Sequence, residues 1–176
     1  MIMRPGKPLL LPASPLFIWV SLLLALMLNM LLNMGGLGRA AWAPDLLALA
    51  LVFWGVHQPL RVGVGLSFAF GLAMDIHQTT LLGQHALAYT ALGYMAASIH
   101  RRLLWFPVMV QAVHVLPIFM VAQILVTLVR LMAGGQLPGW SVALAPVLTA
   151  ALWPVAGMVL LAPQRRAHDP DDNRPL

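Results

Sequence analysis

Hydrophobic positions run almost continuously along this chain, and short segments rich in polar residues, glycine or proline interrupt them at intervals. Six apolar stretches follow from this pattern, and each is long enough to form a helix. They cover residues 16–34, 45–56, 62–76, 83–99, 103–132 and 142–162. A helix that is apolar on every side belongs in lipid or in a protein core. The pattern therefore predicts an all-α protein, a compact bundle of about six transmembrane helices.

The composition strengthens the assignment to the membrane. The chain has 176 residues, of which 61% are hydrophobic and only 9% are charged, whereas about a quarter of the residues in a soluble domain are charged. We therefore expect an integral membrane protein with one transmembrane helical domain over residues 16–163. A leader, residues 1–15, and a polar tail, residues 164–176, flank it. The sequence has no cysteine, which excludes disulfides and thiolate chemistry.

Two of the apolar stretches are short for a membrane crossing. Residues 45–56 and 62–76 provide about 12 and 15 residues, whereas a spanning helix needs about 20. They can lengthen into their flanks, thin the bilayer locally or form a re-entrant hairpin. Whether both fully span stays open at this point.

The basic residues predict the orientation. With the N-terminus in the cytoplasm, six spans place eight of the ten lysines and arginines on the inner side, and only Arg39 and Arg130 on the outer side. The eight are Arg4, Lys7, Arg61, Arg101, Arg102, Arg165, Arg166 and Arg174. Both termini are therefore expected in the cytoplasm. Because these residues flank membrane segments, the basic balance does not indicate a nucleic-acid partner.

A stripe of small residues leads to a carboxylate in the third stretch. Gly63, Ser67 and Gly71 are four residues apart, and the next step reaches Asp75. Small residues at this spacing allow close helix packing, either inside the bundle or against a partner helix. Asp75 lies near the end of its apolar run, where it either caps and anchors a packed helix end or takes a direct part in function.

Other polar residues have structural interpretations. Asp45 follows Pro44 in a first helical turn, where the helix dipole favours an anion. Arg130 is expected near the same side of the membrane, and we predict that it neutralises Asp75 or Asp45. Asn29 and Asn33, one turn apart, are either interhelical hydrogen-bond donors or residues near a helix end.

No catalytic or metal-binding pattern is present. The six histidines are scattered and glutamate is absent, so no metal site and no cofactor is predicted. Ser67 lacks the second glycine of a G-x-S-x-G motif and is better explained as a packing residue. His114 and Gln111 and Gln123 lie in the fifth stretch as isolated polar residues. We therefore expect a protein that is not an enzyme.

The segment from Pro44 to Leu87 resembles the core of the rod shape-determining protein MreD family. The shared features are a helix-opening proline, an aromatic-Trp pair, a proline and a basic residue, a G-x-x-x-D and a later L-G-x-x-A-L. In this chain they are Pro44, Phe53-Trp54, Pro59, Arg61, Gly71 to Asp75, Leu82-Gly83 and Ala86-Leu87, and Leu152-Trp153-Pro154 resembles a late L-W-P of the family.

The resemblance implies a multi-pass protein of the bacterial inner membrane that is not an enzyme. It implies binding to MreC and an influence on RodA, on a class B penicillin-binding protein and, directly or indirectly, on MreB. The implied function is that of a scaffold or regulator of the elongation machinery, which supports lateral peptidoglycan synthesis and rod cell shape.

A second interpretation comes from a likeness at the level of the fold. The family's bundle is similar to the substrate-binding subunits of uptake transporters for vitamins and other small molecules. Those subunits often meet their partner through an Ala-x-x-x-Ala on the first helix, whereas here Ala25 is followed four residues later by Asn29. A likeness of folds does not transfer function by itself.

Overall fold

The computed structural model describes residues 14–34, 42–136 and 139–164, and all regular elements in these ranges are helical. They are α1 (Pro15–Met34), α2 (Leu46–His57), α3 (Val64–Gln78), α4 (Gln84–Leu103), α5 (Val108–Met132), η1 (Trp140–Ala143), α6 (Leu144–Ala151), α7 (Trp153–Leu161) and η2 (Ala162–Gln164). The prediction of an all-α bundle is confirmed.

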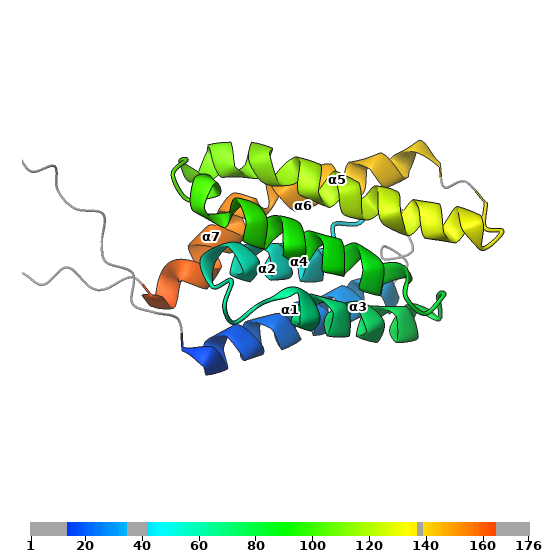
Figure 1. Ribbon diagram of the computed structural model, residues 1–176, viewed down its shortest axis with the longest axis horizontal. Coiled ribbons are helices and arrows are strands. Elements are labelled where there is room, and N and C mark those ends of the chain that lie inside the picture. Colours follow the sequence, from blue (N-terminus) through cyan, green and yellow to red (C-terminus); the bar gives the residue numbers. More distant parts are fainter. Residues whose placement is uncertain (1–13, 35–41, 137–138, 165–176) are drawn as a thin grey trace, which may run out of the picture.

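The helices lie side by side along the long axis of the molecule, and successive traverses run in opposite directions (Figure 1). The last traverse consists of α6 and α7 with the short helices η1 and η2 at their ends. As a result, the first and last described residues lie at the same end of the bundle (Figure 1). This arrangement agrees with an even number of traverses.

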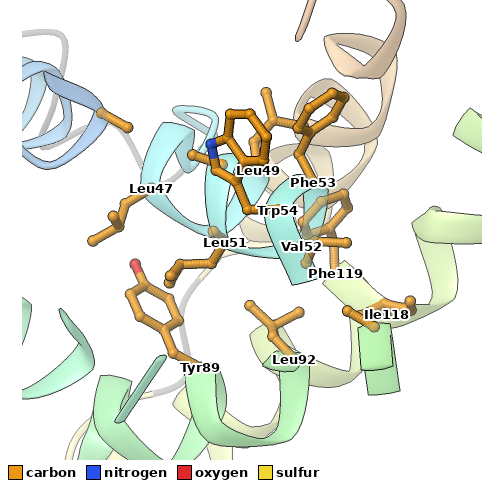
Figure 2. Packing of buried hydrophobic residues seen from close by; sticks show 14 of the residues in the cluster. Leu47, Leu49, Leu51, Val52, Phe53, Trp54, Tyr89, Leu92, Ile118 and Phe119 are labelled. Carbon is orange, nitrogen blue, oxygen red and sulfur yellow. The ribbon is translucent and has the colours of Figure 1, made fainter. Parts of the chain in front are cut away.

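Helix α2 forms the centre of the bundle. Every residue from Leu47 to Val56 is buried, as expected for a helix that is apolar on all sides. Figure 2 shows side chains of two other helices that point toward α2: Tyr89 and Leu92 of α4, and Ile118 and Phe119 of α5. A 12-residue helix is therefore accommodated because other helices enclose it.

Two tryptophans fix α2 and α7 to neighbouring helices. The indole N–H of Trp54 donates to the Ser21 hydroxyl of α1 at 2.8 Å, and that of Trp153 donates to the Gln111 side-chain oxygen of α5 at 3.0 Å. Both rings are buried and pack around Phe53. Phe53 and Trp54 of the aromatic-Trp pair, and Trp153 of the Trp-Pro pair, are thus core residues, whereas Pro154 is half-buried.

The predicted boundaries hold closely for α1 and α2, but they need correction elsewhere. Helix α4 continues to Leu103, past the basic residues that were expected to end it at Ile99, and α5 begins only at Val108. The last stretch is divided at Leu152. Pro154 explains the division, because it has no N–H to donate to the carbonyl four residues earlier.

Within the part of the chain that the structure describes, three segments are long and apolar enough to cross a membrane: Pro15–Met34, Val108–Met132 and Trp140–Gln164. Leu46–His57 is a shorter apolar helix. Helix α3 packs mainly against α4 rather than against α2, so α2 and α3 do not form the closely packed pair expected of a re-entrant hairpin. The structure is that of a helical membrane protein, while six full crossings stay a prediction.

Candidate functional site

Asp75 caps a helix other than its own. Its side chain is completely buried at the end of α3 and faces the first turn of α4. One carboxylate oxygen accepts the backbone N–H of His85 at 2.8 Å, and the other accepts those of Gly83 at 2.9 Å and Ala86 at 3.2 Å. Since Gly83 at the N-cap position has no side chain, Asp75 satisfies the backbone donors that a serine or aspartate usually takes there.

Two side chains complete the environment of Asp75. His85 Nδ1 lies 2.8 Å from the same oxygen that accepts the His85 backbone N–H, and the Thr80 hydroxyl donates to this oxygen at 3.2 Å. Together with the three amides, five donors surround the carboxylate. This geometry corresponds to the first of the two interpretations of Asp75, in which it caps and anchors a packed helix end.

Glycines allow the chain to reach this arrangement. Gly83 has a φ of 107°, in the left-handed region that strains any residue with a Cβ. Gly71 lies one turn before Asp75, and a Cβ at Gly71 would lie 2.7 Å from both the Ala86 nitrogen and the His85 carbonyl oxygen. The G-x-x-x-D and L-G-x-x-A-L segments therefore meet because α3 contacts the backbone of α4 directly.

The small-residue stripe lies largely inside the bundle. Ser67 and Gly71 are buried, and a Cβ at Gly93 of α4 would lie 2.6 Å from the Ser67 hydroxyl oxygen. Gly63 is only half-buried, and an added Cβ there would have no neighbour within 4 Å. Of the two interpretations of the stripe, the structure supports packing between α3 and α4.

Asp45 connects four helices. It is the N-cap of α2, and its carboxylate accepts the Ala48 N–H at 2.9 Å. The same carboxylate accepts Asn29 Nδ2 of α1 at 3.1 Å and the Tyr89 hydroxyl of α4 at 2.6 Å. The Asp45 N–H donates to the Thr149 hydroxyl of α6 at 3.0 Å. Asn29 is thus an interhelical hydrogen-bond donor.

The two carboxylates belong to one group of polar side chains, because the ring of Tyr89 lies edge-on to that of His85, with centroids 6.0 Å apart. We call this group the carboxylate cluster; its members are Asn29, Asp45, Asp75, His85, Tyr89 and Thr149. No buried side-chain nitrogen or oxygen atom in the described ranges lacks a hydrogen-bond partner. The cluster is therefore internally complete.

The predicted pairing of Arg130 with Asp75 or Asp45 is wrong. Arg130 is exposed near the end of α5, and in residues 14–34, 42–136 and 139–164 neither carboxylate has an arginine among its ion-pair partners. The prediction assumed that a carboxylate among apolar helices needs a cation. Backbone amides, a tyrosine, a histidine and an asparagine take that place instead.

The cluster is suited to holding helices together. Every oxygen of Asp75 and Asp45 is engaged by donors from the fold itself. In the described part of the chain, no group of three histidine, cysteine, aspartate or glutamate residues is arranged to hold a metal ion. His114, an isolated polar residue in the sequence, contacts the Val110 carbonyl of its own helix and stacks on Phe106.

A groove at the surface of the bundle has a lining that is mostly apolar and carries no charge. It has a volume of about 570 Å³ and lies between α5 and the helices η1 and α6. We call it the α5–α6 groove. Its lining residues are Met120, Gln123, Ile124, Thr127, Leu128, Gly139, Trp140, Val142, Ala143 and Pro146.

Sequence reasoning did not find several residues of these two regions. Tyr89 and Thr149 carry no local signal that they meet Asp45, because the partners are 44 and 104 positions apart. Gln123 stood out only as an isolated polar residue. The lining of the groove depends on how far α5 and α6 diverge, which the hydrophobic pattern does not encode.

The fold and the two regions define a helical membrane protein whose polar core stabilises its own packing. Comparisons with known proteins agree with this class. The family model described as "rod shape-determining protein MreD" matches residues 13–161. The chain belongs to the MreD family.

A curated relative supports the same assignment. The chain is 31% identical over 115 residues to the rod shape-determining protein MreD of Haemophilus influenzae, an alignment that covers 63% of this chain and 68% of the relative. No solved structure matches. The family places the protein in rod shape determination, and its name refers to a role in cell shape rather than to a reaction.

Proposed function

We propose that this protein is a scaffold of the bacterial elongation machinery, a multi-pass protein of the inner membrane that binds MreC. Through MreC it supports lateral peptidoglycan synthesis by RodA and a class B penicillin-binding protein, in coordination with MreB. The family match over residues 13–161 carries this proposal. The self-satisfied carboxylate cluster supports it, since a rigid bundle is what a scaffold requires.

The proposed topology has six crossings, a single helical domain over residues 16–163, and a leader and a polar tail in the cytoplasm. The absence of native cysteine makes this easy to test. In intact cells, a membrane-impermeant thiol reagent should label Gln136→Cys, an exposed position after α5, from outside, whereas Arg101→Cys should react only after lysis. The reverse pattern would refute the proposed orientation.

The transporter interpretation is not favoured by the packing of α1. Ala25 and Asn29, at the positions where that class carries its Ala-x-x-x-Ala, are both buried in this bundle, and Asn29 is bonded to Asp45. The carboxylate cluster likewise fills the region between α1, α2, α4 and α6 with its own side chains. A scaffold therefore remains the better-supported function.

The test is a pull-down of the tagged, full-length protein from its own membranes in mild detergent, with mass spectrometry of the retained proteins. Recovery of MreC, with or without the wall synthases, is the expected result. Recovery of cytoplasmic ATPases and a bound small molecule without MreC would refute the scaffold and support a transporter subunit.

A further inference from the structure

The α5–α6 groove has one wall formed by a single face of α5. Its residues recur three and four positions apart, which places them along one side of a helix. They are Met120, Gln123, Ile124, Thr127 and Leu128. The opposite wall comes from η1 and α6, where the side chain of Trp140 is 97% exposed. No lining residue is charged, so the groove is suited to an apolar occupant within the membrane.

One hydrogen-bonding group interrupts this apolar lining. Gln123 lies three residues from Met120, the middle residue of the candidate span Val108–Met132, which is about 4.5 Å along the helix axis. Its side chain is half-buried in the groove wall, and within the described residues its amide makes no hydrogen bond. Beyond the backbone hydrogen bonds of α5 itself, the residue is engaged only through its backbone carbonyl, which accepts the Thr127 hydroxyl at 2.8 Å.

Gln111 on the same helix shows what a satisfied glutamine looks like in this protein. Its side-chain oxygen accepts Trp153 Nε1 at 3.0 Å, and its side-chain nitrogen donates to the Phe106 carbonyl at 2.9 Å. Gln123 has neither kind of partner. Water is scarce at this depth of a bilayer, so an amide there gains from a partner that can hydrogen-bond.

The amide discriminates between possible occupants. A lipid acyl chain fills apolar space but offers neither a donor nor an acceptor. A second copy related by a two-fold axis would place one hollow against another, because such a contact uses the same surface on both chains. A single helix of another protein is convex, and a serine, threonine, asparagine or glutamine on it reaches the amide.

We infer that the α5–α6 groove is the docking site for a single membrane-spanning helix of a partner protein, with Gln123 as the hydrogen-bonding contact. The facing side of that helix is apolar, uncharged and carries one hydrogen-bonding side chain near mid-membrane. The inference rests on the proposed function, since it assigns a position to the scaffold's membrane-anchored partner.

Cross-linking in native membranes tests the location. In the cysteine-free chain, Ile124→Cys lies in the groove and is labelled with a maleimide carrying a photoreactive benzophenone. Leu24→Cys on α1 is the control, because Leu24 and Ile124 are similarly exposed at 57% and 52%. Illumination should join a single-span protein to position 124 and not to position 24. Adducts of lipid alone, or of a second copy, at position 124 would overturn the inference.

Substitution tests the contact. Gln123→Leu keeps the size of the side chain but removes its amide, and it should lower retention of the single-span protein about 3-fold to 20-fold, the range of hydrogen bonds between membrane helices. Gln123→Asn should restore part of the retention. Size-exclusion chromatography of the purified variants checks that each is folded before its retention is scored.

The two proposals fail in different ways. If the unmodified protein retains no single-span protein at all, the proposed function and the docking site both fall. If it retains one, and Gln123→Leu retains it equally while position 124 gives no protein adduct, the groove is refuted and the scaffold stands.

Discussion

The carboxylate cluster and the α5–α6 groove both place polar groups among apolar helices, but they differ in whether those groups are satisfied. In the cluster, Asp75 alone receives five donors, and Asp45 is bonded to residues of α1 and α4. In the groove, the amide of Gln123 has no partner within the described residues. A polar network whose contacts are complete stabilises the fold, whereas the unpaired amide is the basis of the docking site that we infer.

Among substitutions that test this difference, Asp75→Ala is expected to lower the free energy of unfolding the most. The change leaves three buried backbone N–H groups at the start of α4 without an acceptor, and each costs about 1–3 kcal/mol. We expect a loss of at least about 3 kcal/mol in the free energy of unfolding, measured by thermal unfolding in detergent micelles. Asp75→Asn should lose less, because one oxygen remains. A variant as stable as the parent would show that the cap is dispensable.

Gly71→Ala should be the next most damaging change, because the added methyl group meets backbone atoms of Ala86 and His85 that cannot rotate away. Overpacking of this kind costs about 1–3 kcal/mol, and we expect the upper end. Gly65→Ala is the matched control on the same helix, since a Cβ there has no neighbour within 4 Å. Equal melting temperatures for the two variants would argue against close contact of α3 with α4.

Tyr89→Phe should have a smaller effect. It removes only the hydroxyl that donates to Asp45 at 2.6 Å and leaves the buried ring in place. Hydrogen bonds to charged groups contribute about 1.5–3 kcal/mol, and we expect a loss near the lower limit. A double-mutant cycle with Asn29→Ala, measured by the same unfolding assay, should show coupling between the two side chains that donate to the Asp45 carboxylate. Strict additivity would mean that they act independently.

Gln123→Leu should have the smallest effect on stability, within about 0.5 kcal/mol, because the fold loses no hydrogen bond. Gln111→Leu should lose about 1–3 kcal/mol, since it leaves the buried N–H of Trp153 without an acceptor and also removes the hydrogen bond to the Phe106 carbonyl. The two substitutions are chemically identical and lie on one helix, so the difference in melting temperature isolates the role of internal partners. A large destabilisation by Gln123→Leu would refute the distinction between the two regions.

The helices themselves could be predicted from the hydrophobic pattern, because each is an apolar run separated from the next by a segment rich in polar residues, glycine or proline. Helix α2, predicted at 45–56, is found at Leu46–His57. The role of Asp45 as a cap also follows from local rules, since it precedes the first turn of α2. Local rules do not predict that Asp75 caps α4, because it lies in the last turn of α3, where the helix dipole disfavours an anion. Helix α4 extends further than predicted because its basic residues can occupy a last helical turn as well as a loop.

The partners of the polar residues could not be predicted. Charge alone suggested Arg130 for the carboxylates, whereas the packing brings Tyr89, Asn29 and His85 to them. Those contacts depend on which faces of α1 and α4 turn inward. The apolar side chains of these two helices are spread too evenly around the helix axis for the sequence to show which face is buried. The sequence carries no mark that distinguishes Gln111 from Gln123, since only the position of Trp153 in space separates them.

The enclosure of α2 also has a consequence for how the protein is made. This helix leaves the ribosome before α4, α6 and α7, yet those later helices supply much of its covering. The insertion machinery therefore handles a 12-residue segment that is too short to span a bilayer alone and still lacks its neighbours. Completion of the core is a late, post-insertion event, so a nascent chain that stops after α3 should be recognised as unfinished by membrane quality control.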